Sequence, residues 1–96
     1  MDKQLKEDLE SIKIPFDLLS AFQSVITELE KKKFKYDSFT NDNEYILTFK
    51  KGKTERVLIA IQQEHLYIRQ YDYKNNKRSL KVLYVVKPSE RNFKLL

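Results

Sequence analysis

The sequence predicts an α+β fold, in which an N-terminal helix pair packs on one face of an antiparallel meander sheet of four to five strands. Apolar residues recur at steps of three and four as far as about residue 33, which is the helical period, and alternate with polar residues beyond it, which is the strand period. Short turn sequences separate the alternating segments, and this favours a meander. Ninety-six residues accommodate one hydrophobic core, so residues 1–96 are expected to form a single domain.

Two helical segments precede the strands. The first, residues 2–13, begins with Asp2, which suits an N-cap, and has a narrow apolar stripe of Leu5, Leu9 and Ile12. The second, residues 16–33, has Pro15 before its first turn and three lysines at its end, as helix termini favour. Its stripe, which we expect to be core, consists of Leu18, Leu19, Phe22, Val25, Ile26 and Leu29.

The strand-like segments follow in close succession. They are expected at residues 34–37, 44–50, 54–62, 64–73 and 78–87. Pro88 ends the last strand, and the tail beyond it either forms a final helical turn or packs Phe93 and Leu95 on the body.

The turns predict which side chains share a face of the sheet. Asn75-Asn76 and Gln63-Glu64 fit two-residue hairpin loops, and Gly52 fits the left-handed position that closes a three-residue loop. The resulting core face is Tyr45, Leu47, Phe49, Val57, Ile59, Ile61, Leu66, Ile68, Leu83 and Val85.

The second face of this sheet mixes apolar and cationic side chains. Its expected members are Ile46, Lys50, Arg56, Leu58, Ala60, Tyr67, Arg69, Tyr71, Tyr73, Arg78, Leu80, Val82 and Tyr84. Such a face is too apolar for an ordinary solvated surface and too cationic for a second core, so it is interpreted as an interaction surface. The assignment depends on register, because a slip of one residue in any turn would exchange the faces of that strand.

The charge of the chain is unevenly distributed. Residues 45–96 hold 12 basic and 4 acidic side chains, whereas residues 1–44 hold 7 basic and 10 acidic ones. This asymmetry indicates a polyanionic or acidic partner for the second half of the chain. The alternative is a solvated, strand-rich surface on which lysines discourage aggregation.

Little in the sequence supports catalysis, and no enzymatic activity is expected. The chain has one histidine, His65 at an expected turn, one glycine and no cysteine, so no metal site, phosphate loop or other cofactor site is predicted. A charged N-terminus and the lack of a long apolar run predict a cytoplasmic protein that does not enter membranes. Frequent Lys, Asn, Ile and Tyr are typical of low-GC bacteria, their phages and mobile elements.

The resulting hypothesis is a small basic module that binds nucleic acid, single-stranded DNA or RNA in preference to duplex, by stacking bases and neutralising phosphates. The residues expected to bind are Lys50, Lys51, Lys53, Arg56, Tyr67, Arg69, Tyr71, Tyr73, Lys74, Lys77, Arg78 and Tyr84. The alternative is an interaction or inhibitor protein that uses the same face to bind an acidic protein or to form a homodimer. Its apolar contacts would come from Leu58, Leu80 and Val82.

Overall fold

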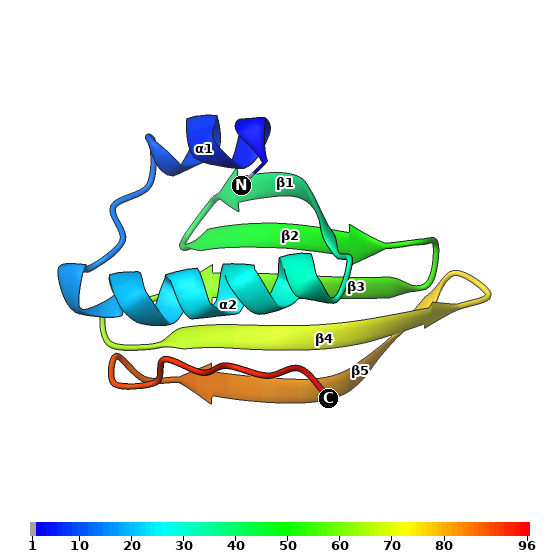
Figure 1. Ribbon diagram of the computed structural model, residues 1–96. Coiled ribbons are helices and arrows are strands. Elements are labelled where there is room, and N and C mark those ends of the chain that lie inside the picture. The colour runs from blue at the N-terminus through cyan, green and yellow to red at the C-terminus, as the bar shows by residue number, and fades with distance from the viewer. Residues whose placement is uncertain (1) are drawn as a thin grey trace.

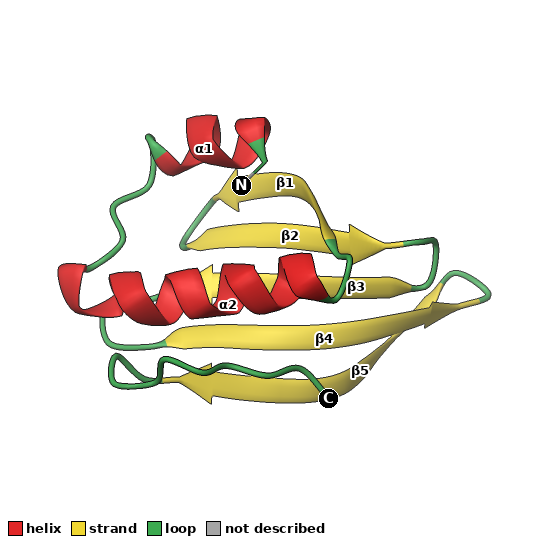
Figure 2. Cartoon of the chain, in the orientation of Figure 1, coloured by secondary structure: helices red, strands yellow, loops and turns green. Residues whose placement is uncertain are grey.

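The five strands of the protein form one antiparallel sheet in the order β1-β2-β3-β4-β5, as the computed structural model shows for residues 2–96 (Figure 1). The strands are β1 (Lys35–Asn41), β2 (Tyr45–Lys51), β3 (Glu55–Ile61), β4 (Leu66–Lys74) and β5 (Lys77–Val86). Figure 2 shows both helices ahead of these strands in the chain, with short loops between neighbouring strands. The predicted α+β meander is therefore confirmed.

The first helix, α1 (Lys3–Leu9), packs against the edge strand β1. The Asp2 carboxylate accepts a hydrogen bond from the Leu5 amide at 3.1 Å, which confirms the predicted cap. The Tyr36 hydroxyl of β1 donates a hydrogen bond to the Asp8 carboxylate. Burial and this bond raise the pKa of the Tyr36 phenol well above its ordinary value.

The second helix, α2 (Leu19–Lys31), lies over the middle of the sheet and follows one 3₁₀ turn, Phe16–Leu18 (Figure 1). Its buried side chains confirm the predicted stripe, except that Leu19 is largely exposed. The Phe34 amide donates to the Leu29 carbonyl at 2.9 Å and the Lys33 amide to the Glu30 carbonyl at 3.1 Å, which closes the helix in a Schellman motif. Because α1 lies at β1 and α2 over the middle strands, the predicted packing of a helix pair on one face of the sheet is not clearly confirmed.

The face of the sheet under α2, called here the covered face, contains the hydrophobic core. Cross-strand pairing sets Leu47 opposite Ile59 and Ile59 opposite Ile68, and all three are fully buried. The two predicted two-residue loops are confirmed, and the β2–β3 loop has three residues as predicted. Gly52 opens that loop instead of closing it, because Lys51 pairs with Glu55. Gly52, Asn75 and Asn76 have positive φ angles of 62°, 51° and 63°, and the Gln62 amide donates to the His65 carbonyl at 3.1 Å across the Gln63-Glu64 loop.

A β-bulge in β5 overturns part of the predicted face assignment. Tyr71 pairs with Leu80 as predicted, but Gln70 pairs with Val82, which leaves Lys81 as an extra residue in β5. An extra residue reverses the alternation of side chains beyond it. The predicted placement of Tyr84 and Val82 on the second face is therefore wrong, and so is the placement of Leu83 and Val85 in the core. Tyr84 packs on the covered side, and Leu83 and Val85 are exposed.

A second bulge lies in β1, which is longer than predicted. Tyr36 pairs with Phe49 and Ser38 with Thr48, so that Asp37 is the extra residue. Its carboxylate forms an ion pair with Lys50 at 3.3 Å.

The C-terminal tail packs on the body, which decides between the two predicted alternatives. The Phe93 amide donates to Ser24 Oγ at 2.8 Å, and the Phe93 ring meets the Tyr84 ring edge-on at 5.0 Å between centroids. The Leu95 amide donates at 2.8 Å to Oε2 of Glu28, whose carboxylate is buried and has Lys94 as a distant ion partner at 4.0 Å. Across residues 2–96, the structure contains no helix with the length and apolar character that crossing a bilayer requires.

Candidate nucleic-acid interface

The opposite face of the sheet, called here the open face, lies away from α2 and the tail (Figure 1). Cross-strand pairing arranges its side chains in three rows that each span all five strands. The rows are Lys35–Lys50–Arg56–Tyr71–Leu80, Ser38–Thr48–Leu58–Arg69–Leu83 and Thr40–Ile46–Ala60–Tyr67–Val85. The pair Tyr73–Arg78 continues the face toward the β4–β5 turn. No position in these rows is occupied by a carboxylate.

The first row sets three cations side by side. Lys35 is opposite Lys50, and Lys50 is opposite Arg56. Like charges directly opposite each other destabilise an antiparallel pair. Two local contacts offset this cost: the Asp37 carboxylate reaches Lys50, and Nη1 of Arg56 donates to the carbonyls of Gly52 and Glu55 at 3.0 and 2.8 Å.

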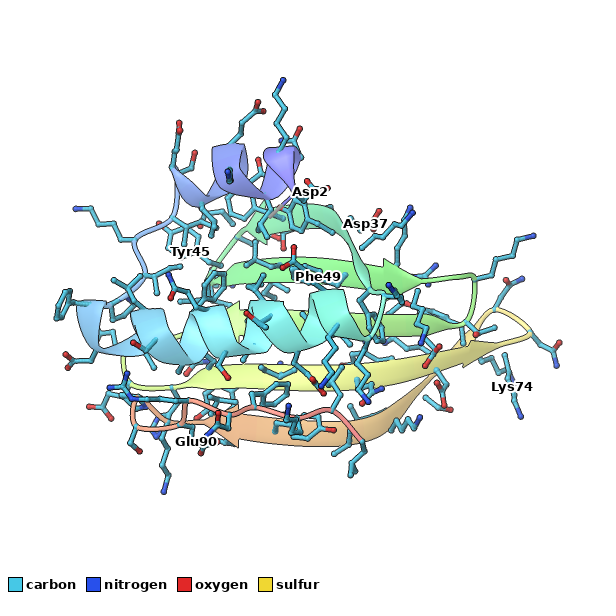
Figure 3. All side chains as sticks on the ribbon, viewed as in Figure 1. Asp2, Asp37, Tyr45, Phe49, Lys74 and Glu90 are labelled. Carbon is cyan, nitrogen blue, oxygen red and sulfur yellow. The ribbon has the colours of Figure 1, made fainter. Side chains whose placement is uncertain are left out.

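Three basic segments meet at one end of the molecule, called here the basic end. They are the close of α2 with the start of β1 (residues 30–37), the β2–β3 turn (residues 50–56) and the β4–β5 turn (residues 72–78). Together they hold 11 Lys and Arg against 4 Asp and Glu, whereas the remainder of the chain holds 8 against 10. Figure 3 shows Lys74 near the tip of its hairpin, pointing away from the body. The basic end therefore produces a positive field beyond the sheet.

The tyrosines expected to stack on bases have different surroundings. Tyr71 as a residue is only 9% exposed, and the Arg78 guanidinium carbon lies 4.3 Å from the centroid of its ring. The guanidinium carbon of Arg56 lies 5.4 Å from the Tyr73 centroid. Tyr84 is on the covered side, where its hydroxyl accepts a hydrogen bond from the Leu96 amide at 2.8 Å. Only Tyr67 and Tyr73 remain as partly exposed rings on the open face.

The other predicted residues divide between the two faces and the turns. Arg69 and Leu58 are half-buried neighbours in the second row, and Leu80 is exposed in the first. Lys53, Lys74 and Lys77 are exposed at the turns. Lys51, predicted to bind at its turn, lies on the covered side, where its ammonium is 5.7 Å from the centroid of the Phe34 ring.

Lys35, Leu83 and Val85 lie on the open face but were not among the predicted binding residues. Lys35 completes the basic row, and its alternation with Phe34 and Tyr36 was the signal that could have identified it. Leu83 and Val85 lie on this face because of the bulge at Lys81. The residues around that bulge, Ser79 to Val82, include no glycine or proline that would have marked it.

Metal-binding groups, the single histidine and similarity to known proteins were also considered as guides to function. Within residues 2–96, no three His, Cys, Asp or Glu side chains are grouped so that they could hold a metal ion. His65 is half-buried at its turn, with its ring 6.1 Å from that of Tyr67. Comparisons of the chain with protein-family models, with curated proteins and with solved structures find no match.

Proposed function

We propose that this protein is a non-catalytic nucleic-acid-binding module whose basic end binds the phosphate backbone. The observation that carries the proposal is the row Lys35–Lys50–Arg56, three cations on neighbouring strands in a row that itself contains no carboxylate. The Asp37 carboxylate at the β1 bulge pairs with Lys50. A polyanion laid across this row removes the repulsion that the free protein tolerates. Release of counterions from the nucleic acid adds to the affinity.

The position of the row supports this reading. The row lies at the end of the sheet where the β2–β3 and β4–β5 turns place further lysines, so phosphates leaving the sheet meet Lys53, Lys74 and Lys77. Nucleic acid is found in the cytoplasm, and a chain without cysteine suits that reducing compartment, so we infer that the protein acts there. The composition also fits an origin in a low-GC bacterium, a phage or a mobile element.

The test is a fluorescence-anisotropy titration of a labelled oligonucleotide at several salt concentrations. The variant Lys50→Gln with Arg56→Gln should weaken binding and lower the slope of log K against log salt by roughly one to two, because each lost phosphate contact changes the slope by about 0.7–0.9. The matched control is Lys3→Gln with Lys6→Gln on α1, which removes the same charge outside the three basic segments. Absence of binding by the wild-type protein at low salt would refute the proposal, as would an equal loss in the control.

A second candidate function, docking of an acidic protein, is favoured by one observation. Leu80, Leu83 and Val85 form an apolar strip on β5 that is 54%, 47% and 44% exposed, beside Tyr67 and Arg69. Tyrosine and arginine are favoured at the centres of protein interfaces. The cationic face fits an acidic partner and disfavours a second copy, because two such faces repel each other.

A peptide of alternating leucine and glutamate is a suitable probe for the second candidate. Binding that is lost in Leu83→Ser with Val85→Ser, while the Lys3→Gln control retains it, would support protein docking. Failure of the peptide to bind at millimolar concentration would remove this candidate. Light scattering that finds a dimer, split by the same two serine substitutions, would replace the acidic partner with a second copy of the chain.

A further inference from the structure

We infer that the basic end recognises the phosphodiester backbone itself, with little contribution from stacking or reading of bases. The inference rests on the proposed function and names its ligand class: a phosphodiester chain, whatever bases it carries. It departs from the sequence-based expectation that tyrosines of this face provide stacking platforms for single strands.

The first support is the arrangement of Tyr71 and Arg78. The guanidinium carbon of Arg78 lies 4.3 Å from the Tyr71 centroid, a cation–π distance, and Tyr71 as a residue is 9% exposed. A base could stack on this ring only by displacing the guanidinium. Displacement would cost the cation–π contact and would remove a cation from the place where the phosphates lie.

The second support is the way in which Arg56 is held. Its guanidinium lies over the Tyr73 ring, with 5.4 Å from the guanidinium carbon to the centroid. Its Nη1 donates to the carbonyls of Gly52 and Glu55, which fixes the side chain to the β2–β3 turn. An arginine fixed in this way presents its remaining N–H donors in a rigid fork, and this geometry matches the oxygens of a phosphate.

The third support is the location of the remaining rings. Tyr84 points to the covered side, where it packs against Phe93. Tyr67 is on the open face, but it lies four residues before Tyr71 along β4. At the rise of a strand, this places the two residues about 13 Å apart. The tyrosines nearest to the basic row, Tyr71 and Tyr73, thus contact arginines, and the other partly exposed ring of the open face, Tyr67, lies away from the row.

The test compares oligothymidine with an abasic phosphodiester oligomer of the same length, sugar and label, in the same salt. We expect the two dissociation constants to agree within about threefold, because phosphate contacts supply most of the affinity in such a site. Oligothymidine binding tenfold tighter or more would overturn the inference and leave the proposed function intact. If neither ligand binds at low salt, the proposed function itself fails.

Substitutions distinguish whether the Tyr71 ring supports Arg78 or stacks on bases. Tyr71→Leu should weaken both ligands by the same factor, about three- to fivefold, because Arg78 loses its support. Arg78→Gln should give the same result, and it is the safer variant because Arg78 is exposed and its replacement disturbs no core packing. Tyr45→Leu, a tyrosine packed on the covered side, is the matched control and should leave both affinities unchanged. Weakening of oligothymidine alone by Tyr71→Leu would show that bases stack on the ring and would overturn the inference.

Discussion

The covered and open faces belong to the same five strands, and their differences arise from side chains one residue apart. In the middle of the sheet Leu47, Ile59 and Ile68 point toward α2 and are fully buried. Their neighbours Leu58 and Arg69 point the opposite way, where no helix covers them. The covered face supplies the burial that stabilises the fold. The rows of the open face contain no carboxylate, and their cationic and apolar side chains remain available for a ligand.

The largest difference in stability is expected when the same leucine-to-alanine substitution is made once on each face. Leu47→Ala should lower the free energy of unfolding by about 2–5 kcal/mol, because it leaves a cavity under α2. Leu83→Ala, the matched change on the open face, should lower it by no more than about 0.5 kcal/mol. Urea denaturation followed by circular dichroism measures both. Equal losses would mean that the open face is also packed in solution.

Substitutions of Glu28 test how much its hydrogen bond to the C-terminal tail stabilises the covered face. Glu28→Ala should cost about 1–3 kcal/mol of unfolding free energy, since it leaves the buried Leu95 amide without its acceptor. Glu28→Gln keeps an acceptor oxygen and should cost less. Hydrogen exchange at the Leu95 amide should accelerate in the alanine variant. Unchanged exchange there would show that Phe93 and Leu95 hold the tail by packing alone.

The hydrogen bond between Tyr36 and Asp8 joins the edge strand β1 to α1, and its contribution to stability can be measured. Tyr36→Phe should cost about 1 kcal/mol, because it removes the hydrogen bond to Asp8. The pKa of the phenol is higher in the folded protein than the ordinary value of 10.0, so its contribution to stability is present below about pH 10 and is lost as the pH rises further. Urea denaturation between neutral and strongly alkaline pH should show a shallower alkaline decline in Tyr36→Phe. A decline identical to that of the wild-type protein would contradict the assignment.

The smallest effect is expected at Lys33, which belongs to neither face. This residue has a φ of 69° at the close of α2, a left-handed conformation that favours glycine. Lys33→Gly should raise the unfolding free energy by up to about 1 kcal/mol. Lys33→Asn, a residue that also tolerates this conformation, should give a smaller gain. Thermal unfolding is sufficient to rank the three proteins, and destabilisation by glycine would contradict the account.

The sequence was sufficient to predict the fold wherever local chemistry decides the structure. The Gln63-Glu64 and Asn75-Asn76 loops leave few choices of turn, so the pairing of β3 with β4 and the row Arg56–Tyr71–Leu80 could be predicted. The bulge at Lys81 could not be predicted, because it coincides with tertiary packing of Tyr84 against Phe93, nine residues further along the chain. The same bulge gave the open face Leu83 and Val85 in place of Val82 and Tyr84.

The candidate site was predictable in composition but not in arrangement. Tyr71 and Arg78 were both expected on the open face, as separate contributors to stacking and charge. Their positions, with the guanidinium over the ring, depend on side-chain conformations that strand alternation does not specify. The like-charged row across β1, β2 and β3 likewise needed the register of β1, which the bulge at Asp37 sets.

The most direct test of the central claim, that the basic row of the open face binds phosphate, is a titration of one labelled oligonucleotide at about 50 mM and about 200 mM salt. The proteins compared are the wild type, Lys50→Gln with Arg56→Gln, and Lys3→Gln with Lys6→Gln. The account predicts binding that weakens steeply with salt in the wild type and the α1 control, and that is weaker and less salt-dependent in the variant of the row. An affinity that does not depend on salt, or one that the substitutions in the row leave unchanged, would contradict it.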